Sequence, residues 1–297
     1  MYKVFAEPPL DDFCINRIAH ALKLYAPPNV KFVTDETEAD LVVLYAHGRK
    51  KSIWWSICRL KEQNRQAAVV QMQLKSTPNP HTADWLDIWR YAAVVWSYYN
   101  LAQLCQEEST PVNFNFYHAP LGVDPSAFTD HNLKRKYTMG IHSKGWSHES
   151  LREVVTAAQE AKKSVLVFDN PNDYGAGVFF TGLVKNNDRR MSYWYSQCRY
   201  VSGLRRTEGF ELPVIEGLMC GARPICFDLP SYRIWFEGLV EFIPESGGRA
   251  QIIPALIKLF NQKPRPVSRA EKQQVKEKFN WGSIARGFWE RVYEHKI

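Results

Sequence analysis

The sequence lacks the marks of several protein classes. Its longest apolar runs, Leu41–Ala46 and Ala92–Trp96, are much shorter than the roughly 18 residues that a membrane helix needs. The N-terminus has no extended apolar stretch of the kind that a signal peptide carries. No Asn-x-Ser/Thr sequon occurs. These absences favour a cytoplasmic protein without a transmembrane segment.

Cysteine is sparse and is not arranged for metal binding. None of the six cysteines forms a Cys-x-x-Cys pair, which argues against a structural zinc site. Most of them stand beside apolar residues, so we expect buried, reduced thiols. We therefore predict no metal site.

Three common catalytic signatures are also missing. Gly175-Ala-Gly177 lacks the third glycine of a dinucleotide-binding loop, and no Gly-x4-Gly-Lys-Ser/Thr or Gly-x-Ser-x-Gly occurs. The sequence thus disfavours an ordinary dehydrogenase, a P-loop ATPase and an α/β-hydrolase.

The composition is that of a globular protein with about two domains. The chain has 297 residues, of which 45% are hydrophobic and 23% charged. Residues 1–120 carry no net charge, so the whole net charge of +7 lies in residues 121–297. A basic half favours phosphate ligands, nucleic acid or an anionic membrane surface, and a solvated basic surface remains the alternative.

Short β-rich runs alternate with helical patterns along the whole chain. Strands are predicted at Tyr2–Phe5, Val30–Val33, Leu41–Ala46, Ala68–Gln73, Val94–Ser97, Phe114–His118, Tyr137–Ile141, Val165–Asp169, Val178–Gly182, Tyr200–Ser202, Arg223–Phe227 and Val240–Ile243. Helices are predicted around Ile15–Leu22 and at Ser52–Gln63, Tyr98–Glu107, His148–Ala161, Met191–Cys198, Leu212–Cys220, Gln251–Phe260, Arg269–Lys278 and Trp281–Glu294. Such alternation indicates an α/β fold with mostly parallel sheets.

Residues 119–128 interrupt the periodicity with two prolines and a glycine. We place the domain boundary here, with domains at 1–120 and 121–280 and a last helical segment, 281–297, that packs back on the first domain. Each domain is expected to be a doubly wound, Rossmann-like sheet. Ligands of such sheets bind at the carboxyl ends of the strands, here in a cleft between the two domains.

The most informative stretch begins at Glu208 and ends at Asp228. A loop there leads into a helix with Pro213 in its first turn, where the missing N–H costs nothing. The N–H groups of such a helix start favour an anionic or oxygen-rich ligand. Glu216 lies inside the helix, and a buried carboxylate needs hydrogen-bond donors such as sugar or ribose hydroxyls.

This stretch resembles the Glu-x7-Glu motif of retaining GT-B glycosyltransferases, particularly family four. It reads Glu-Gly-Phe-x-Leu-Pro-x-x-Glu-x-x-x-Cys-Gly-x-x-Pro from Glu208. The resemblance extends over most of the second half, whereas the first half matches only in its α/β pattern. The supporting segments are Pro120-Leu-Gly-Val-Asp124 with Phe128, Gly140 with Lys144-Gly145, Phe180-Thr-Gly182, Phe279-Asn-Trp281 and Val292-Tyr293.

The resemblance implies that the second domain holds a nucleotide-sugar, with UDP as the expected nucleotide. Glu216 would bind the ribose hydroxyls, Glu208 the transferred sugar, and Lys144 the pyrophosphate. The backbone of Gly209 and Phe210 would assist. The candidate catalytic residues at this site are Glu208, Lys144 and Arg205. The candidate donor-binding residues are Glu216, Gly209, Phe210, Glu211, Leu212, Arg206 and His142.

Two departures from the family pattern concern the donor. The family has an arginine shortly before the lysine, and His142 stands in that region here. Arg205 and Arg206 are our substitutes, because arginine grips phosphate oxygens with two N–H groups. Glu211 replaces a glycine of the family, so it either changes the preferred sugar or points at solvent.

The family's usual reaction retains the anomeric configuration through an oxocarbenium-like transition state without an enzyme nucleophile. Cations and N–H dipoles would stabilise the departing diphosphate. The sequence has no Asp-x-Asp, the motif of metal-dependent GT-A enzymes. We therefore expect a metal-independent hexosyltransferase with no cofactor, for which the nucleotide-sugar is a co-substrate.

Acceptor-side residues should follow the strands of the first domain. The candidates are His47 and Arg49 after the third strand, and Lys75 and His81 after the fourth. An ordinary surface position is the competing interpretation of each.

Two other functions remain open. One is a DNA glycosyltransferase that modifies 5-hydroxymethylpyrimidines, suggested by the pI of about 9.0 and by Arg49–Lys51. Such an enzyme needs an aromatic pocket for an extruded base. Trp54, Trp55, Tyr98 and Tyr99 are available, although we expect each to pack in the core. The other is a non-catalytic nucleotide-sugar-binding protein.

Overall fold

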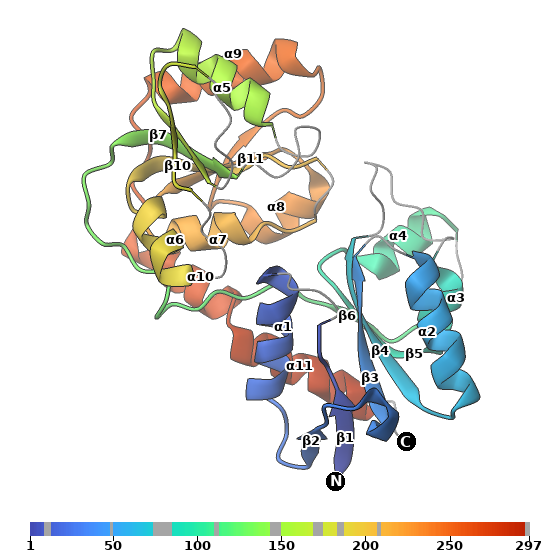
Figure 1. Cartoon of the computed structure of the whole chain (residues 1–297). Helices are drawn as coiled ribbons and strands as arrows, with labels where there is room; N and C mark the ends of the chain where they lie inside the picture. Colours follow the sequence, from blue (N-terminus) through green and yellow to red (C-terminus); the bar gives the residue numbers. More distant parts are fainter. Residues whose placement is uncertain are drawn as a thin grey trace. The chain divides into compact units, whose positions relative to one another are not determined.

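The structure is a computed structural model that describes residues 1–8, 13–47, 50–73, 85–109, 113–142, 150–168, 175–182, 187–206 and 209–294. The chain forms two compact units, which we call unit 1 (Met1–Leu121 with Trp281–Ile297) and unit 2 (Gly122–Asn280) (Figure 1). Each has its own sheet and core. Among the described residues, no helix has the length and apolar content that crossing a bilayer requires.

Unit 1 contains a six-stranded parallel sheet in the order β2-β1-β3-β4-β5-β6. Its strands are β1 (Tyr2–Phe5), β2 (Val30–Phe32), β3 (Leu41–His47), β4 (Gln66–Gln73), β5 (Ala92–Ser97) and β6 (Phe116–His118). Its helices are α1 (Phe13–Leu24), the 3-10 turn η1 (Glu36–Glu38), α2 (Lys50–Glu62), α3 (Leu86–Tyr91), α4 (Leu101–Glu107) and α11 (Trp281–Glu294).

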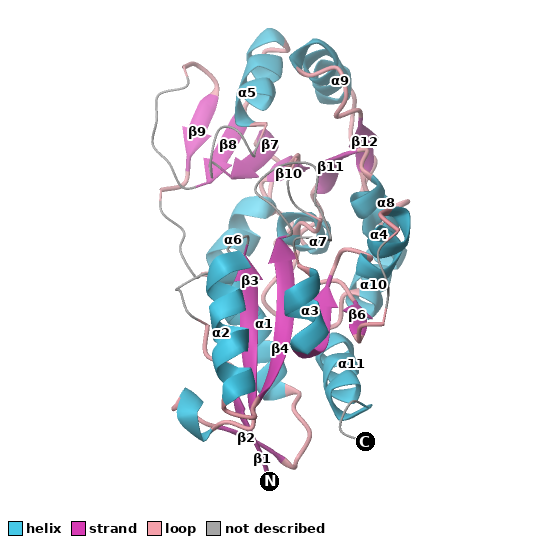
Figure 2. Cartoon of the chain, turned by 90° about the vertical axis from the view of Figure 1, so that its right-hand side faces the viewer, coloured by secondary structure: helices cyan, strands magenta, loops and turns pink. Residues whose placement is uncertain are grey.

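Helices cover both faces of this sheet. α2 and α3 pack on one face, and α1 and α11 pack together against the other (Figure 2). β5 is buried along its whole length, as its continuous apolar run predicts for a central parallel strand. Trp289 of α11 donates its indole N–H to the carbonyl of Leu22 at 3.1 Å, and Tyr117 donates to the carbonyl of Ile284 at 2.8 Å. These bonds tie the last helix to unit 1.

Unit 2 contains a second six-stranded parallel sheet in the order β12-β11-β10-β7-β8-β9. Its strands are β7 (Tyr137–His142), β8 (Val165–Phe168), β9 (Val178–Phe180), β10 (Cys198–Gly203), β11 (Arg223–Phe227) and β12 (Glu241–Ile243). Its helices are α5 (Leu151–Glu160), α6 (Asp188–Tyr195), α7 (Leu212–Met219), α8 (Pro230–Phe236), α9 (Arg249–Asn261) and α10 (Arg269–Lys278).

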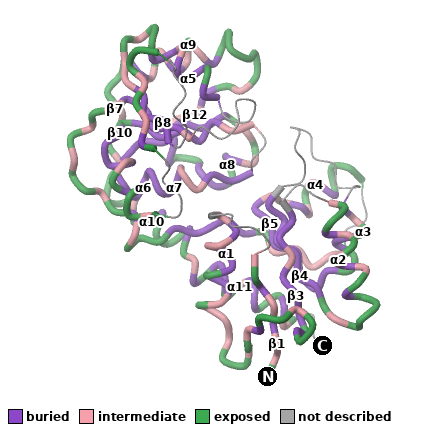
Figure 3. The backbone as a smooth tube through the Cα atoms, viewed as in Figure 1, coloured by how far each residue is buried: buried purple, intermediate pink, exposed green. Residues whose placement is uncertain are grey.

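α5 and α9 pack on one face of this sheet, while α6, α7 and α10 lie on the other (Figure 1). The central strands β7, β8, β10 and β11 are largely buried between these two layers of helices (Figure 3). The architecture confirms the predicted α/β fold with doubly wound parallel sheets.

Two sequence predictions are corrected. The helix predicted over Met191–Cys198 ends at Tyr195, because Cys198 already pairs with Tyr137 of the neighbouring strand. The predicted core position of Trp55 is also wrong, since 64% of this residue is exposed. Ile53, Ile57 and Leu60 form the buried face of α2, and Trp55 lies on the outer face.

Candidate functional site

The connections of unit 2 reverse direction between β7 and β10. After β7 the chain adds β8 and β9 on one side, and it then returns to place β10 on the other side. β7 and β10 pair in parallel, with Val201 opposite Gly140, so both strands end at the same edge. Such a topological switch point is where doubly wound sheets bind their ligands. The residues that follow β7 and β10 are therefore the candidate site.

α7 lies unusually close to β10. A Cβ on Gly217 would stand 2.3 Å from Cγ1 of Val201, and a Cβ on Gly203 would stand 2.6 Å from Cγ2 of Val214. Only glycine permits these two approaches. Pro213 occupies the first turn of the helix, as the sequence predicts. The position of α7 relative to the switch point is thus fixed by packing.

Glu216 is buried inside α7, with 3% of its surface exposed. Its neighbours on the helix, Ile215 and Gly217, are also buried. Burial, together with the nearby carboxylate of Glu216, raises the pKa of Cys220 to about 12, although a hydrogen bond to Ser192 opposes the change. The thiol therefore stays protonated at neutral pH, and Glu216 is the acidic group that this helix places in the interior.

Glu211 immediately precedes α7 and is 1% exposed, so the expectation that it points at solvent is wrong. Tyr232 of α8 donates its hydroxyl hydrogen to Oε1 of Glu211 at 3.3 Å, and Nε of Arg205 lies 3.5 Å from the same oxygen. A buried carboxylate requires such partners. Sequence reasoning missed Tyr232, because nothing in the pattern links residue 232 to the loop before α7.

Arg206 has two carboxylate partners. Its Nη2 donates to Oε1 of Glu153 at 3.0 Å, and its Nε lies 3.4 Å from Oε1 of Glu245. Its guanidinium also stacks 5.3 Å from the ring centre of Phe227. Arg206 thereby connects the loop after β10 to α5. Arg205, by contrast, lies beside the buried Glu211 of the same loop.

The side chain of Phe210 belongs to the core. It is 4% exposed, and its ring packs against Phe236 and Phe279 at centroid distances of 5.1 and 5.7 Å. Gly209 is buried and Leu212 is half-buried. Phe210 can therefore serve a ligand only through its backbone, which is the role that the sequence analysis predicts for it.

His142 stands at the carboxyl end of β7. Its Nε2 is 3.1 Å from the hydroxyl of Tyr195, and its ring centre is 4.9 Å from that of Phe168. Tyr195 is fully buried, so the imidazole is held from the side of the core. Sequence reasoning singled out His142 but missed Tyr195, its hydrogen-bond partner.

Several predicted residues lie outside the described residues, namely Lys144, Glu208, Arg49, Lys75 and His81. His47 closes β3, at the switch point between β1 and β3 in unit 1. His118 closes β6 at the same edge, and sequence reasoning did not select it. Partial burial lowers the pKa of His118, while a hydrogen bond that its ring N–H donates to the backbone of Tyr98 opposes this. The imidazole is thus neutral at physiological pH and able to accept a proton.

The comparisons with known proteins bear on the fold. No protein-family model matches the chain, and no curated protein matches its sequence. Sucrose-phosphate synthase from Thermosynechococcus elongatus superposes with a TM-score of 0.69 at 15% identity, over 87% of this chain and 74% of that chain. Alr3699/HepE of Anabaena, solved in complex with UDP, gives 0.69 at 13% identity, over 99% and 100%.

A third similar structure is trehalose-6-phosphate synthase, studied for glycosyl transfer with retention. It superposes with a TM-score of 0.64 at 9% identity, over 95% of this chain and 78% of that chain. Together with the two parallel six-stranded sheets, these similarities show that the chain has the GT-B fold, with two Rossmann-like domains.

Proposed function

We propose that this chain is a glycosyltransferase that binds a UDP-linked hexose in unit 2 and transfers the hexose to a hydroxyl acceptor. The observation that carries the proposal is the buried Glu216 on a helix packed beside the β7/β10 switch point. This glutamate is the second acid of the Glu-x7-Glu resemblance. The similarity to HepE, which was solved with UDP, supports the choice of nucleotide.

The donor would be held by groups on both sides of the switch point. Glu216 would accept hydrogen bonds from the ribose hydroxyls, and Glu208 from the hydroxyls of the hexose. Lys144 and Arg205 would bind the diphosphate, and we favour Arg205 over Arg206 because Arg206 already bridges Glu153 and Glu245. A guanidinium and a backbone N–H are the groups that bind phosphate most readily in proteins.

Transfer is proposed to retain the anomeric configuration, without an enzyme nucleophile. Negative charge grows on the diphosphate as the glycosidic bond breaks, and the cations of Lys144 and Arg205 would stabilise that charge in the transition state. The acceptor hydroxyl then attacks from the face that the leaving group vacates. Because protein cations neutralise the diphosphate, the proposed reaction is metal-independent. The similarity to a synthase studied for retention supports this stereochemistry.

The acceptor is assigned to the carboxyl edge of the sheet in unit 1. His47, Arg49, Lys75 and His81 remain the predicted residues. We add His118, since it ends β6 at that edge and its lowered pKa suits a proton acceptor. An imidazole that takes the proton of the acceptor hydroxyl would raise the nucleophilicity of that oxygen.

Release of UDP from UDP-glucose, UDP-galactose and UDP-N-acetylglucosamine tests the proposal, each with water, an oligosaccharide or hydroxymethylated DNA as acceptor. We expect release from one donor, with the α-anomer of the product seen by NMR. Glu208→Gln should abolish release, whereas Glu237→Gln, at the exposed end of α8, should not.

The arms of this assay separate the alternatives. Release that requires hydroxymethylated DNA would assign the DNA-modifying reaction. Binding of a donor without release in any arm would show a non-catalytic binder and overturn the proposed transferase.

A further inference from the structure

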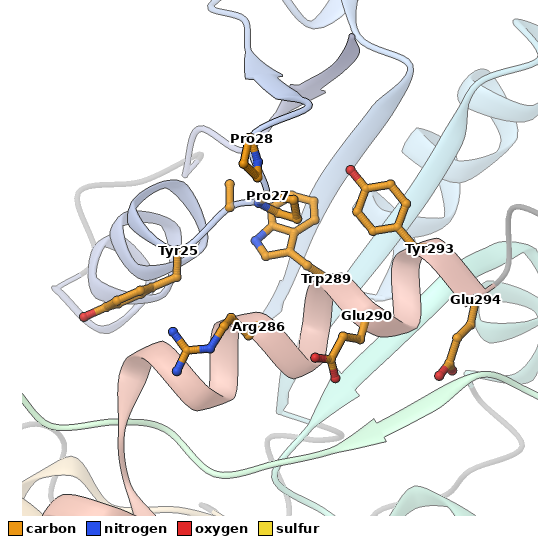
Figure 4. Close-up of a pocket in the computed structure, with 9 residues that line it drawn as sticks. Tyr25, Pro27, Pro28, Arg286, Trp289, Glu290, Tyr293 and Glu294 are labelled. Atoms are coloured by element: carbon orange, nitrogen blue, oxygen red, sulfur yellow. The ribbon is translucent and has the colours of Figure 1, made fainter.

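A hollow of about 790 Å³ lies in unit 1, between the end of α1 and the last turns of α11 (Figure 4). Its volume falls within the range of small-ligand sites. α11 supplies one wall, and the segment that follows α1 supplies the other. The lining residues are Tyr25, Ala26, Pro27, Pro28, Arg286, Trp289, Glu290, Tyr293 and Glu294.

The apolar part of the hollow is rigid. Trp289 is 1% exposed, and its indole N–H donates to the carbonyl of Leu22 at 3.1 Å. Tyr293 donates its hydroxyl hydrogen to Oδ1 of Asn29 at 2.8 Å. These bonds occupy the polar ends of both rings, and Pro27 and Pro28 lie above Trp289 in the view of Figure 4. A ligand therefore meets preformed ring surfaces.

Three polar groups at the hollow have spare hydrogen-bonding capacity. Within the described part of the chain, the side chains of Tyr25, Arg286 and Glu290 form no hydrogen bond. The Arg286 guanidinium lies 5.9 Å from the Tyr25 ring centre. The Tyr25 hydroxyl, the Arg286 guanidinium with its five N–H donors and the Glu290 carboxylate thus border one apolar surface.

The charges at the hollow are balanced. Arg286 and Glu290 offset each other, and Glu294 pairs with Arg291 at 3.1 Å. A phosphate or an anionic lipid would require an excess of cations. A quaternary ammonium ligand would place its charge near Arg286. A neutral molecule with one apolar face and several hydroxyl groups fits both the rings and the polar border.

We propose that this hollow binds a neutral saccharide. Its C–H face would lie on the tyrosine and proline rings, and its hydroxyls would donate to Glu290 and accept from Arg286 and Tyr25. The hollow lies beside the amino ends of β1 and β2, since Pro28 directly precedes β2 and the Tyr2 ring is 6.4 Å from that of Tyr293. The hollow therefore lies at the opposite end of the strands from His47. Saccharide binding there requires neither the nucleotide-sugar donor nor glycosyl transfer.

Saturation-transfer NMR on the full chain without nucleotide tests this inference, with maltohexaose, cellohexaose and chitohexaose as probes. We expect at least one probe to bind, and Tyr25→Ala and Glu290→Gln each to weaken it at least about fivefold. Trp55→Ala is the matched control, since it removes an aromatic side chain of unit 1 that is 64% exposed and outside the hollow. It should leave the affinity unchanged.

Glu290 is exposed, so Glu290→Gln tests the site even if Tyr25→Ala impairs folding. The inference is overturned if no probe binds below about 10 mM, or if both variants bind as tightly as the wild type. Displacement of a bound probe by UDP, or preferential binding of choline or a proline-rich peptide over all three saccharides, would also overturn it.

Discussion

Nε of Arg205 lies 3.5 Å from Oε1 of Glu211, and Tyr232 donates to that same oxygen at 3.3 Å. Arg205 precedes Glu208 in the sequence and Glu211 follows it. The carbonyl oxygen of Arg205 lies 3.2 Å from the same hydroxyl, whose single hydrogen the two acceptors share. One tyrosine of α8 thus contacts both ends of the segment that carries Glu208.

This arrangement separates a phosphate-binding role of Arg205 from a purely structural one. Arg205→Ala should weaken UDP binding at least about tenfold, because a hydrogen bond to a charged group is lost. Glu211→Gln should leave UDP binding intact or strengthen it, because it removes a competing negative charge. Isothermal titration of both variants checks this, with Arg189→Ala, at an exposed position of α6, as the control. Equal effects of the two substitutions on UDP affinity would indicate that Arg205 serves only Glu211.

The close approach of α7 to β10 predicts a packing effect. Gly217→Ala places a Cβ 2.3 Å from Cγ1 of Val201 and should reduce the free energy of unfolding by about 1–3 kcal/mol. Val201→Ala in the same chain should recover part of that loss, because it removes the clashing methyl group. Urea denaturation of the two single variants and the double variant measures this coupling. If the losses of unfolding free energy in the two single variants simply add in the double variant, the described packing is contradicted.

An ion pair in unit 2 predicts how the free energy of unfolding depends on pH. Arg223 is fully buried and donates to both carboxylate oxygens of Glu271 at 2.8 and 3.2 Å. Burial raises the pKa of Glu271, but hydrogen bonds from Arg223 and Ser268 prevail and lower it from 4.5 to about 2. The stabilisation is complete above the unfolded pKa and is lost as the pH falls from about 4.5 towards 2. Unfolding free energies of the wild type should decline over this window.

Glu271→Gln is the matching variant for this pair. It leaves the buried guanidinium without its charge partner and should cost about 3–5 kcal/mol at neutral pH. Its stability should also vary less between pH 4.5 and 2, since the titrating group is absent. A variant with the same acid dependence as the wild type would show that Glu271 does not contribute it.

The strands were predictable because each is an apolar or β-branched run between breakers. All predicted strands overlap a strand of the structure. α3 and α8 were missed, since each is short and carries aromatic residues in place of a clear helical stripe. α6 was predicted three residues too far along the chain, because no glycine or proline separates it from β10. Trp55 was misplaced because two adjacent tryptophans cannot both face the core of one helix.

The candidate site was predictable only in part. The Glu-x7-Glu resemblance singled out Glu216 and the residues around Glu211 as candidates, because these lie close together in the sequence. The sequence did not reveal the partners of these residues. Tyr232 reaches Glu211, Tyr195 reaches His142, and Glu153 reaches Arg206, each from another element. Only tertiary packing determines such contacts.

Binding of UDP and of 2′,3′-dideoxy-UDP to the wild type and to Glu216→Ala tests the central claim most directly. If Glu216 holds the ribose, the wild type should bind UDP at least about tenfold more tightly than the dideoxy analogue, and the variant should bind both with similar weak affinity. A variant that still prefers UDP by the same factor, or a wild type that binds neither, would contradict the claim that unit 2 holds a nucleotide-sugar through Glu216.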